Sequence, residues 1–465
     1  MIRFRHTFFI LSACSLSIFL TWVKLEGENG NPNSEPSASE FGRSWTLPAA
    51  IERALSLNPD IQRAEASMNR QRGIRVQVRS DLLPSMTLTG SANGRDEGLI
   101  DRNPNGFNQV PSDQTAITQD SYIGSIEFRQ IIFDGLKRWN RYKQETLRLK
   151  GERSTVEDTQ RRIASFVKQS FDQLLFMSSV VEIRKETVST FETILDITQK
   201  KLSAGDVTEY ESLRVRTELQ SAIAELAEAE TNLIKAEQIF RSLLVIPQPV
   251  DSQDERIKLA GKLEEVPFDK SFGKALGLAL DNREDLRAAR YRWEAEKKGV
   301  HAAHGEWLPM LEVFANYSLR SSYFDDNTEL EGWTIGAVGH WNIFDGFQRS
   351  GAIVSEKAEA RAAQITYQEL EYKITSQLQE LYAQIAQSRS VIKYHRASMD
   401  LGSESLHQAE RLYEVGQVGL EIVLDAQITL RHSQINFSRA LFNYNSALAQ
   451  IEYAIATPLN GEEEQ

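Results

Sequence analysis

Residues 122–135 read YIGSIEFRQIIFDG, and residues 333–346 read WTIGAVGHWNIFDG. In both stretches apolar and polar side chains alternate, and both stretches end in Phe-Asp-Gly. Alternation with a period of two is typical of a β-strand that has one apolar face. Because the same ending recurs 211 residues later, from Phe133 to Phe344, the sequence contains two copies of one unit.

Other short motifs recur in the same way, at an offset of 225 residues before these strands and of 211 residues after them. The recurring pairs are Ala54-Leu55 with Ala279-Leu280, Leu83-Pro84 with Leu308-Pro309, and Gly205 with Gly416. The difference between the offsets places 14 extra residues in the first copy, between Pro84 and Phe133. We therefore predict two structural repeats, residues 45–245 and 269–459, joined by a connection over 246–268.

Long helices are predicted from the placement of proline, which interrupts helix interiors. Residues 112–246 and 310–457 contain none. We expect a long helix at about 135–204 and another at about 346–415, each roughly 100 Å long at 1.5 Å per residue. A tip turn and a second helix follow, at about 208–245 and about 419–457. Both second helices carry seam residues at the 3-4 spacing of a coiled coil: Leu219, Ala222, Leu226, Ala229, Leu233, Ala236, Phe240 and Leu243, with their counterparts from Leu430 to Ala454.

Each repeat is also predicted to hold a β-hairpin, at about 86–133 and about 310–344. Four strands cannot close a barrel, because membrane barrels need about eight. An open strand edge is not tolerated in lipid, so membrane-crossing strands would have to be shared, and three copies would supply twelve. A solvated surface sheet alternates in the same way. Long helices with a seam also fit a trimeric coiled-coil structural or adhesin protein of the cell envelope, and this alternative stays open.

The first 25 residues are predicted to be a signal peptide, with Arg3, Arg5 and His6 ahead of an apolar stretch over 7–23. Leu11 to Cys14 resembles the lipobox of bacterial lipoproteins, which makes Cys14 a candidate lipidation site. One alternative is that Cys14 is removed together with the cleaved signal peptide. Another is that the segment is retained as an N-terminal anchor helix. A polar linker over 26–44 follows, and residues 460–465 form an acidic tail.

Several classes of function lack support in the sequence. The net charge of -12 argues against nucleic acid as a partner. Cys14 is the single cysteine, so the rest of the chain has no disulfide framework or thiol nucleophile. No phosphate-binding loop or Gly-x-Ser-x-Gly motif occurs. His301, His304 and Glu306 lie near a predicted helix end, where we interpret them as surface residues. We expect no enzyme activity, no cofactor and no metal site.

The order and spacing of these motifs resemble the TolC-like outer-membrane efflux proteins, from about Trp45 to Pro458. The matching motifs are Ala54-Leu55 through Asn58-Pro59-Asp60, Leu83-Pro84, Phe133-Asp134-Gly135, their second copies, and YEVGQVGLEIVLDAQ over 413–427. The resemblance implies a mainly α fold with transmembrane β-strands, in which residues 246–268 form an equatorial connection around the middle of the helices. A homotrimer would form a 12-stranded outer-membrane β-barrel continuous with a 12-helix periplasmic α-barrel.

The resemblance also implies the function of a passive exit duct in a tripartite efflux or type I secretion system. The duct would lie in the outer membrane, in contact with its lipid, and extend into the periplasm. Its partners would be a periplasmic adaptor and an inner-membrane pump of the RND, ABC or MFS class.

Two glycines mark the predicted tip, because glycine permits the positive φ that ends a helix. The resemblance implies that the tip docks the adaptor. The predicted docking residues are Leu202, Gly205, Asp206, Val207, Tyr413, Gly416, Gln417, Val418 and Leu420. Plain helix-hairpin residues would show the same pattern.

Asp425 matches the tip aspartate of the family in its Val-Leu-Asp-Ala context. Three copies near the axis would make an acidic ring that filters by charge. Ile422 stands where some relatives carry a second aspartate, which puts a second ring in doubt; Glu421, one helical turn before Asp425, is the candidate substitute. Solvated surface carboxylates are the alternative interpretation of both residues.

Overall fold

The structure is a computed structural model that describes residues 44–94, 120–247, 256–321 and 330–457. The predicted signal peptide, the candidate lipidation site Cys14 and the acidic tail 460–465 lie outside the described residues. So do residues 26–43 of the linker and residues 248–255 of the equatorial connection. Within the described ranges, no helix is both long enough and apolar enough to cross a membrane.

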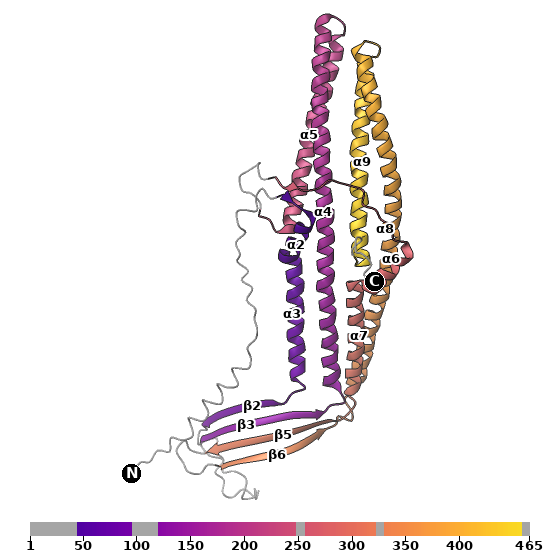
Figure 1. Ribbon diagram of the computed structural model, residues 1–465. Helices are drawn as coiled ribbons and strands as arrows, with labels where there is room; N and C mark the ends of the chain where they lie inside the picture. The colour runs from indigo at the N-terminus through magenta and orange to yellow at the C-terminus, as the bar shows by residue number, and fades with distance from the viewer. Residues whose placement is uncertain (1–43, 95–119, 248–255, 322–329, 458–465) are drawn as a thin grey trace, which may run out of the picture. The chain divides into compact units, whose positions relative to one another are not determined.

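Two long helices organise the chain, α4 (Lys137–Ala204) and α8 (Gln348–Glu414). Their 68 and 67 residues span roughly 100 Å each at 1.5 Å per residue. After a tight turn, each is followed by an antiparallel 36-residue helix, α5 (Glu209–Leu244) or α9 (Leu420–Ile455). Figure 1 shows α4 beside α5 and α8 beside α9. The seam residues predicted on α5 and α9 are buried or half-buried, because they face these neighbours.

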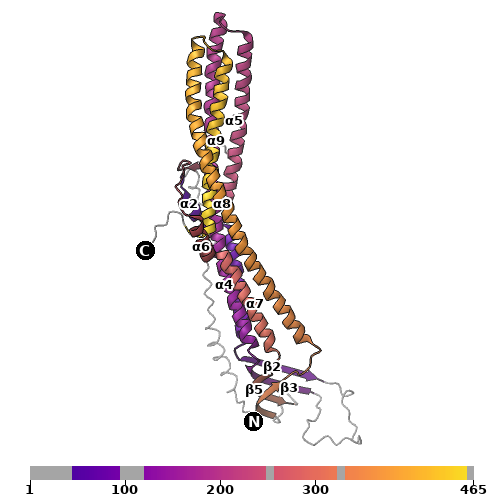
Figure 2. The same cartoon turned by 90° about the vertical axis from the view of Figure 1, so that its right-hand side faces the viewer.

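Four shorter helices precede the long ones in matching pairs. They are α2 (Leu47–Leu57) and α3 (Pro59–Ser80) in the first repeat, and α6 (Phe272–Asn282) and α7 (Glu284–Gly305) in the second. Their boundaries agree residue for residue at the offset of 225. Figure 1 shows α3 alongside the sheet-proximal part of α4, and Figures 1 and 2 show α7 between the sheet-proximal parts of α4 and α8. The two repeats therefore share one helical arrangement.

The strands form one antiparallel sheet in the order β2-β3-β5-β6. Their bounds are β2 (Ser85–Gly94), β3 (Asp120–Phe133), β5 (Met310–Ser321) and β6 (Leu330–His340). One row of paired residues runs Leu88, Ile126, Tyr317, Trp333. The predicted apolar side chains thus share one face. On the other face Arg129 pairs with Glu127 and Glu312. Two further strands, β1 (Ser44–Trp45) and β4 (Lys258–Leu259), have two residues each.

The regular alternation breaks near the end of both second strands of the hairpins. β6 stops at His340, whereas the pattern continued to Phe344. Beyond it, Trp341 Nε1 donates a hydrogen bond to the carbonyl of Trp307 at 3.1 Å, which directs the chain toward α7. In β3 the register shifts between Ile131 and Phe133, so Ile132 sits in a bulge. The regular strand pairing therefore does not include Ile132 and Ile343, although both continue the apolar alternation of the sequence.

A duplicated joint connects each hairpin to its long helix. Arg138 pairs with Asp134 at 2.8 Å, and Arg349 pairs with Asp345 at 2.6 Å. The Arg138 guanidinium also donates to the carbonyls of Ile131 in β3 and of Asp81 after α3. The Arg349 guanidinium donates to the carbonyls of Ile343 after β6 and of Glu306 after α7. Because charge-assisted hydrogen bonds are the strong ones, the joint fixes three chain segments around one arginine.

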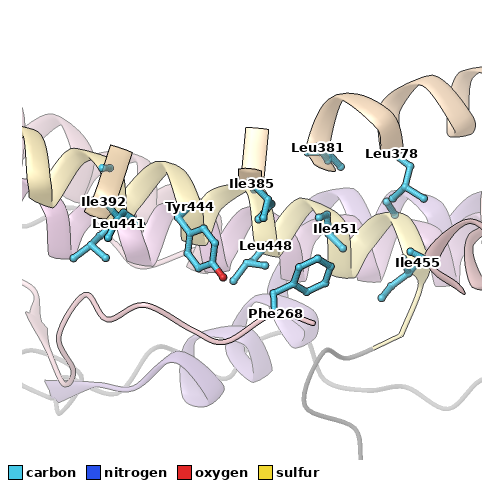
Figure 3. Packing of buried hydrophobic residues seen from close by; sticks show 14 residues of the cluster. Phe268, Leu378, Leu381, Ile385, Ile392, Leu441, Tyr444, Leu448, Ile451 and Ile455 are labelled. Carbon is cyan, nitrogen blue, oxygen red and sulfur yellow. The ribbon is translucent and has the colours of Figure 1, made fainter. Parts of the chain in front are cut away.

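The described part of the equatorial connection packs on the core of α8 and α9. Figure 3 shows Phe268 among the apolar side chains of both helices. Tyr444 Oη donates to the carbonyl of Val266 at 2.7 Å, and Asn445 Nδ2 donates to that of Glu264 at 2.9 Å. The connection is thus held by side chains of α9 as well as by burial.

Candidate functional site

The two tip turns are built by the same backbone device. The N–H groups of Gly205 and Asp206 donate to the carbonyls of Leu202 and Lys201. This pair of bonds is a Schellman motif, which needs a left-handed residue after the helix. Gly205 supplies it with φ 83°. In the second repeat Gly416 has φ 75°, and the equivalent bonds come from Gly416 and Gln417. The predicted glycine role in the turns is confirmed.

The predicted docking residues differ in their exposure. Gly205, Asp206, Gly416 and Gln417 are exposed at the turns. Leu202, Val207 and Val418 are half-buried. Tyr413 and Leu420 are 6% and 2% exposed, so their side chains belong to the core of the tip.

A lysine connects the two turns across the repeats. Lys201 Nζ lies 4.0 Å from the centroid of the Tyr413 ring and donates a hydrogen bond to the Tyr413 carbonyl at 2.6 Å. The Tyr413 hydroxyl lies 3.4 Å from Thr198 Oγ1. The lysine charge also lies at the C-terminal end of α8, where the helix dipole favours a cation. We call this contact the Lys201–Tyr413 clasp. The sequence analysis missed Lys201.

An apolar cluster stands behind the clasp. It combines side chains from all four tip helices, among them Phe191 and Ile194 of α4, Val215 of α5, Tyr413 of α8 and Leu424 of α9. Beside it lies a cavity of about 230 Å³ between α4, α8 and α9. Burial raises the pKa of Glu410 at this cavity, although His407 opposes the rise. The two helical hairpins are thus joined near their ends by both apolar and polar contacts.

The two candidate gate carboxylates lie on the first turns of α9. Asp425 and Glu421 are both exposed, whereas Val423 and Leu424 between them are buried. The Glu421 carboxylate folds back over Gly419, the residue that precedes α9. A carboxylate at a helix N-terminus is favoured by the helix dipole. Asp425 therefore presents a charge on the outer face of the tip core.

Of His301, His304 and Glu306, the two histidines are exposed. Glu306 pairs with Lys137 at 2.6 Å and lies next to the joint. The structure instead brings Glu296, Glu356 and Glu359 within 4.8 Å of one another. The Arg148 guanidinium forms an ion pair with the Glu296 carboxylate at 2.9 Å and offsets its negative charge. No local pattern in the sequence predicts this group, because its members come from different helices, α7 and α8.

A half-buried carboxylate lies farther along α4. Asp172 lines a cavity of about 180 Å³ with residues of α2, α9 and the equatorial connection. Burial raises the pKa of Asp172 to about 7, and the charge of Lys168 opposes the rise. The ammonium of Lys168 is already paired with Glu452. Asp172 is therefore a group that titrates near neutral pH inside the helical part of the protein.

Comparison with known proteins gives consistent matches. A model of the family described as outer membrane efflux protein matches residues 50–244 and 275–457. The chain is 18% identical over 421 residues to nodulation protein T of Rhizobium leguminosarum bv. trifolii, over 89% of this chain and 86% of that protein. It is 20% identical over 413 residues to the solvent efflux pump outer membrane protein SrpC of Pseudomonas putida, over 86% and 82%. The crystal structure of the CmeC outer membrane channel of Campylobacter jejuni has a TM-score of 0.77 at 18% identity, over 90% of this chain and 87% of that chain.

Proposed function

The chain belongs to the outer membrane efflux protein family, and from this premise we propose that three copies form the outer-membrane exit duct of a tripartite export system. The sheet of each copy would contribute four strands to a shared barrel of twelve in the outer membrane. The helices would form a tunnel in the periplasm. An inner-membrane pump would supply the energy, and the duct would supply a hydrated passage without chemistry.

The arrangement of one chain supports this proposal. The sheet lies at one end of α4 and α8, and the tip turns lie at the other end (Figure 1). The sheet has one apolar face, formed by the row that contains Ile126 and Tyr317. A coiled-coil adhesin would need the helices but no amphipathic sheet. The duct needs both, so it accounts for the sheet as well as for the helices.

The tip is the proposed gate and docking site. The exposed residues Gly205, Asp206, Gly416 and Gln417 would meet the periplasmic adaptor, and the Lys201–Tyr413 clasp would hold the two hairpins together in the closed form. Asp425 from three copies would form an acidic ring near the axis. Such a ring attracts cations and filters by charge.

Single-channel recording in a planar bilayer tests this assignment. We expect Asp425→Ala to raise the conductance or to weaken block by divalent cations, because it removes one charge per copy from the narrowest part. Asp206→Ala is the matched control, since Asp206 is an exposed carboxylate at the other turn. If Asp425→Ala leaves both the conductance and the cation block unchanged, the gate assignment is wrong. Absence of any conductance from the purified wild-type protein would refute the duct itself.

A further inference from the structure

The helices next to the sheet form a curved row, and one cavity identifies its concave side. In this row α3 contacts α4, α4 contacts α7, and α7 contacts α8. All four helices line a cavity of about 380 Å³, to which they contribute residues such as Gln71, Arg148, Arg292 and Thr366. Helices in a row can share one cavity only on the concave side of the row. The opposite side of each helix therefore belongs to the convex face.

Two residues of α4 lie on this convex face. An α-helix has 3.6 residues per turn, so residues nine apart are two and a half turns apart and point in opposite directions. Arg148 lines the cavity, and Trp139 lies nine residues before it. Glu152 also lines the cavity, and Lys143 lies nine residues before Glu152. Trp139 and Lys143 therefore point away from the concave side.

Two residues of α7 are placed in the same way. Lys298 lies nine residues after Ala289, which lines the cavity. His301 lies nine residues after Arg292, which lines it as well. Both side chains are thus on the convex side of α7. We call four residues together the convex-face patch: Trp139, Lys143, Lys298 and His301.

The patch residues of the two helices lie at the same height. α4 and α7 are antiparallel neighbours. Beside the sheet, Gly135 lies directly against Gly305. Farther from the sheet, Gln144 Nε2 donates a hydrogen bond to Glu296 at 3.1 Å. All four patch residues fall between these two contacts along their helices, so they share one band of the convex face.

The patch presents positive charge that the chain does not neutralise. Trp139 is 45% exposed, and the other three residues are exposed or half-buried. Among the residues that the structure describes, neither lysine of the patch forms an ion pair. Glu294, one turn before Lys298, is already paired with Arg290 at 3.2 Å. The patch is therefore open to an anion from outside the chain.

The equivalent positions of the other repeat carry neither a charge nor a ring. At the offsets of 211 and 225 the counterparts of the patch are Ser350, Val354, Gly73 and Val76. Val354 and Val76 are 68% and 56% exposed, so these positions reach the surface too. The shared fold therefore does not require cations here, and the patch is a property of one pair of helices.

We propose that the convex-face patch binds the phosphate of an anionic phospholipid headgroup, in the membrane leaflet next to the helices. The two lysine ammonium groups would pair with the phosphate, and His301 would donate a hydrogen bond to it. Trp139 would lie between headgroups and acyl chains, as tryptophan does at membrane interfaces. Cations beside a membrane-spanning element attract anionic lipids. This inference rests on the proposed exit duct and names a lipid class that its outer surface binds.

The depth of the patch fits the headgroup region. Trp139 lies four residues beyond Gly135, roughly 6 Å from the end of the sheet at 1.5 Å per residue. The headgroup region is about 5–7 Å thick on each side of a bilayer. Side chains on a helix lean toward its N-terminus, which for α4 is the end at the sheet. Lys143 Nζ accordingly lies 4.8 Å from the centroid of the Trp139 ring, so its charge reaches the depth of that ring.

Native mass spectrometry of the purified full chain in detergent tests the proposal. The probes are dioleoyl phosphatidylglycerol, which is anionic, and dioleoyl phosphatidylcholine, which has no net charge. We expect the wild type to bind phosphatidylglycerol more tightly than phosphatidylcholine. Lys143→Gln and Lys298→Gln should each weaken binding of phosphatidylglycerol about fivefold, the factor that one cation near a membrane surface contributes. Binding of phosphatidylcholine should not change.

Lys357→Gln is the matched control. Lys357 is exposed and lies nine residues before Thr366, a cavity residue of α8, so it is a cation of the convex face outside the patch. Its removal should leave the binding of both lipids unchanged. Lys143→Arg keeps the charge and should keep the affinity, which separates loss of the cation from damage to the fold.

The outcomes separate the patch from the duct. Selective weakening in the two patch variants supports the proposal. No preference for phosphatidylglycerol in the wild type, or an equal loss in Lys357→Gln or in Lys143→Arg, overturns it. Displacement of the lipid by excess glycerol phosphate also overturns it, because a soluble phosphate would then suffice. Conductance in a planar bilayer leaves the exit duct standing in each of these cases, whereas its absence refutes the duct on which the proposal rests.

Discussion

The Lys201–Tyr413 clasp allows the most direct test of the proposed gate. In Lys201→Met the side chain keeps its length but loses its charge, so the cation over the Tyr413 ring and the hydrogen bond to the Tyr413 carbonyl both disappear. The apolar cluster that contains Tyr413 is untouched. The substitution therefore removes the polar contact between the two turns and leaves their packing in place.

The magnitude follows from the two contacts. A cation over an aromatic ring contributes roughly 0.5–2 kcal/mol. A hydrogen bond from a charged group contributes about 1.5–3 kcal/mol. Lys201 is half-buried, so solvent screening places the sum near the lower end, at about 2 kcal/mol. If opening separates the two hairpins, the closed tip loses this free energy, and the ratio of open to closed states rises by about 30-fold.

The assay is the open probability of single channels in a planar bilayer. Lys200→Met is the matched control, because Lys200 is the preceding residue and pairs within its own helix, with Asp196. We expect Lys201→Met to open far more often than the wild type, and Lys200→Met to match the wild type. Equal open probabilities for the two variants would refute the clasp as a closing contact.

Two further predictions concern stability. Because the pKa of Asp172 is raised from 3.8 to about 7, the free energy of unfolding should fall as the pH rises between these values, by at most on the order of 4 kcal/mol. Asp172→Asn should abolish this loss in denaturant titrations from pH 4 to pH 8, and Asp196→Asn should not. Gly135→Ala should lower the free energy of unfolding by about 1–3 kcal/mol more than Gly205→Ala. Both glycines have positive φ, but only a Cβ on Gly135 would collide with the backbone of Gly305; equal losses in thermal or denaturant unfolding would contradict this.

The helices were predictable because their signals are local. Proline-free stretches predicted the long helices, and a glycine marked each tip turn. The seam spacing on α5 and α9 identified the side chains that the structure buries, such as Phe240 and Tyr444. The strand faces were also predictable, since period-two alternation needs no knowledge of the partner strand.

The rest depended on contacts between distant residues. The end of β6 depends on the bond between Trp341 and the Trp307 carbonyl, which no local pattern reveals. Lys201 was missed because its partner Tyr413 lies in the other repeat. Asp172 was missed because the equivalent residue is Ala383, so the duplication gave no hint of a half-buried carboxylate.

Among the residues that the structure describes, four residues other than glycine have a left-handed backbone. They form two pairs related by 211 positions, Leu136 with Phe347 and Val245 with Ala456. The left-handed region costs such residues roughly 1–2 kcal/mol each. Leu136 and Phe347 are also 59% and 74% exposed, so burial of their side chains within the chain does not offset the free energy of this strain. Strain of this kind persists where something else requires it. Leu136 and Phe347 therefore place exposed apolar side chains where each hairpin meets its long helix, for contact with an apolar environment outside the chain. In the proposed duct this environment is the periplasmic edge of the outer membrane.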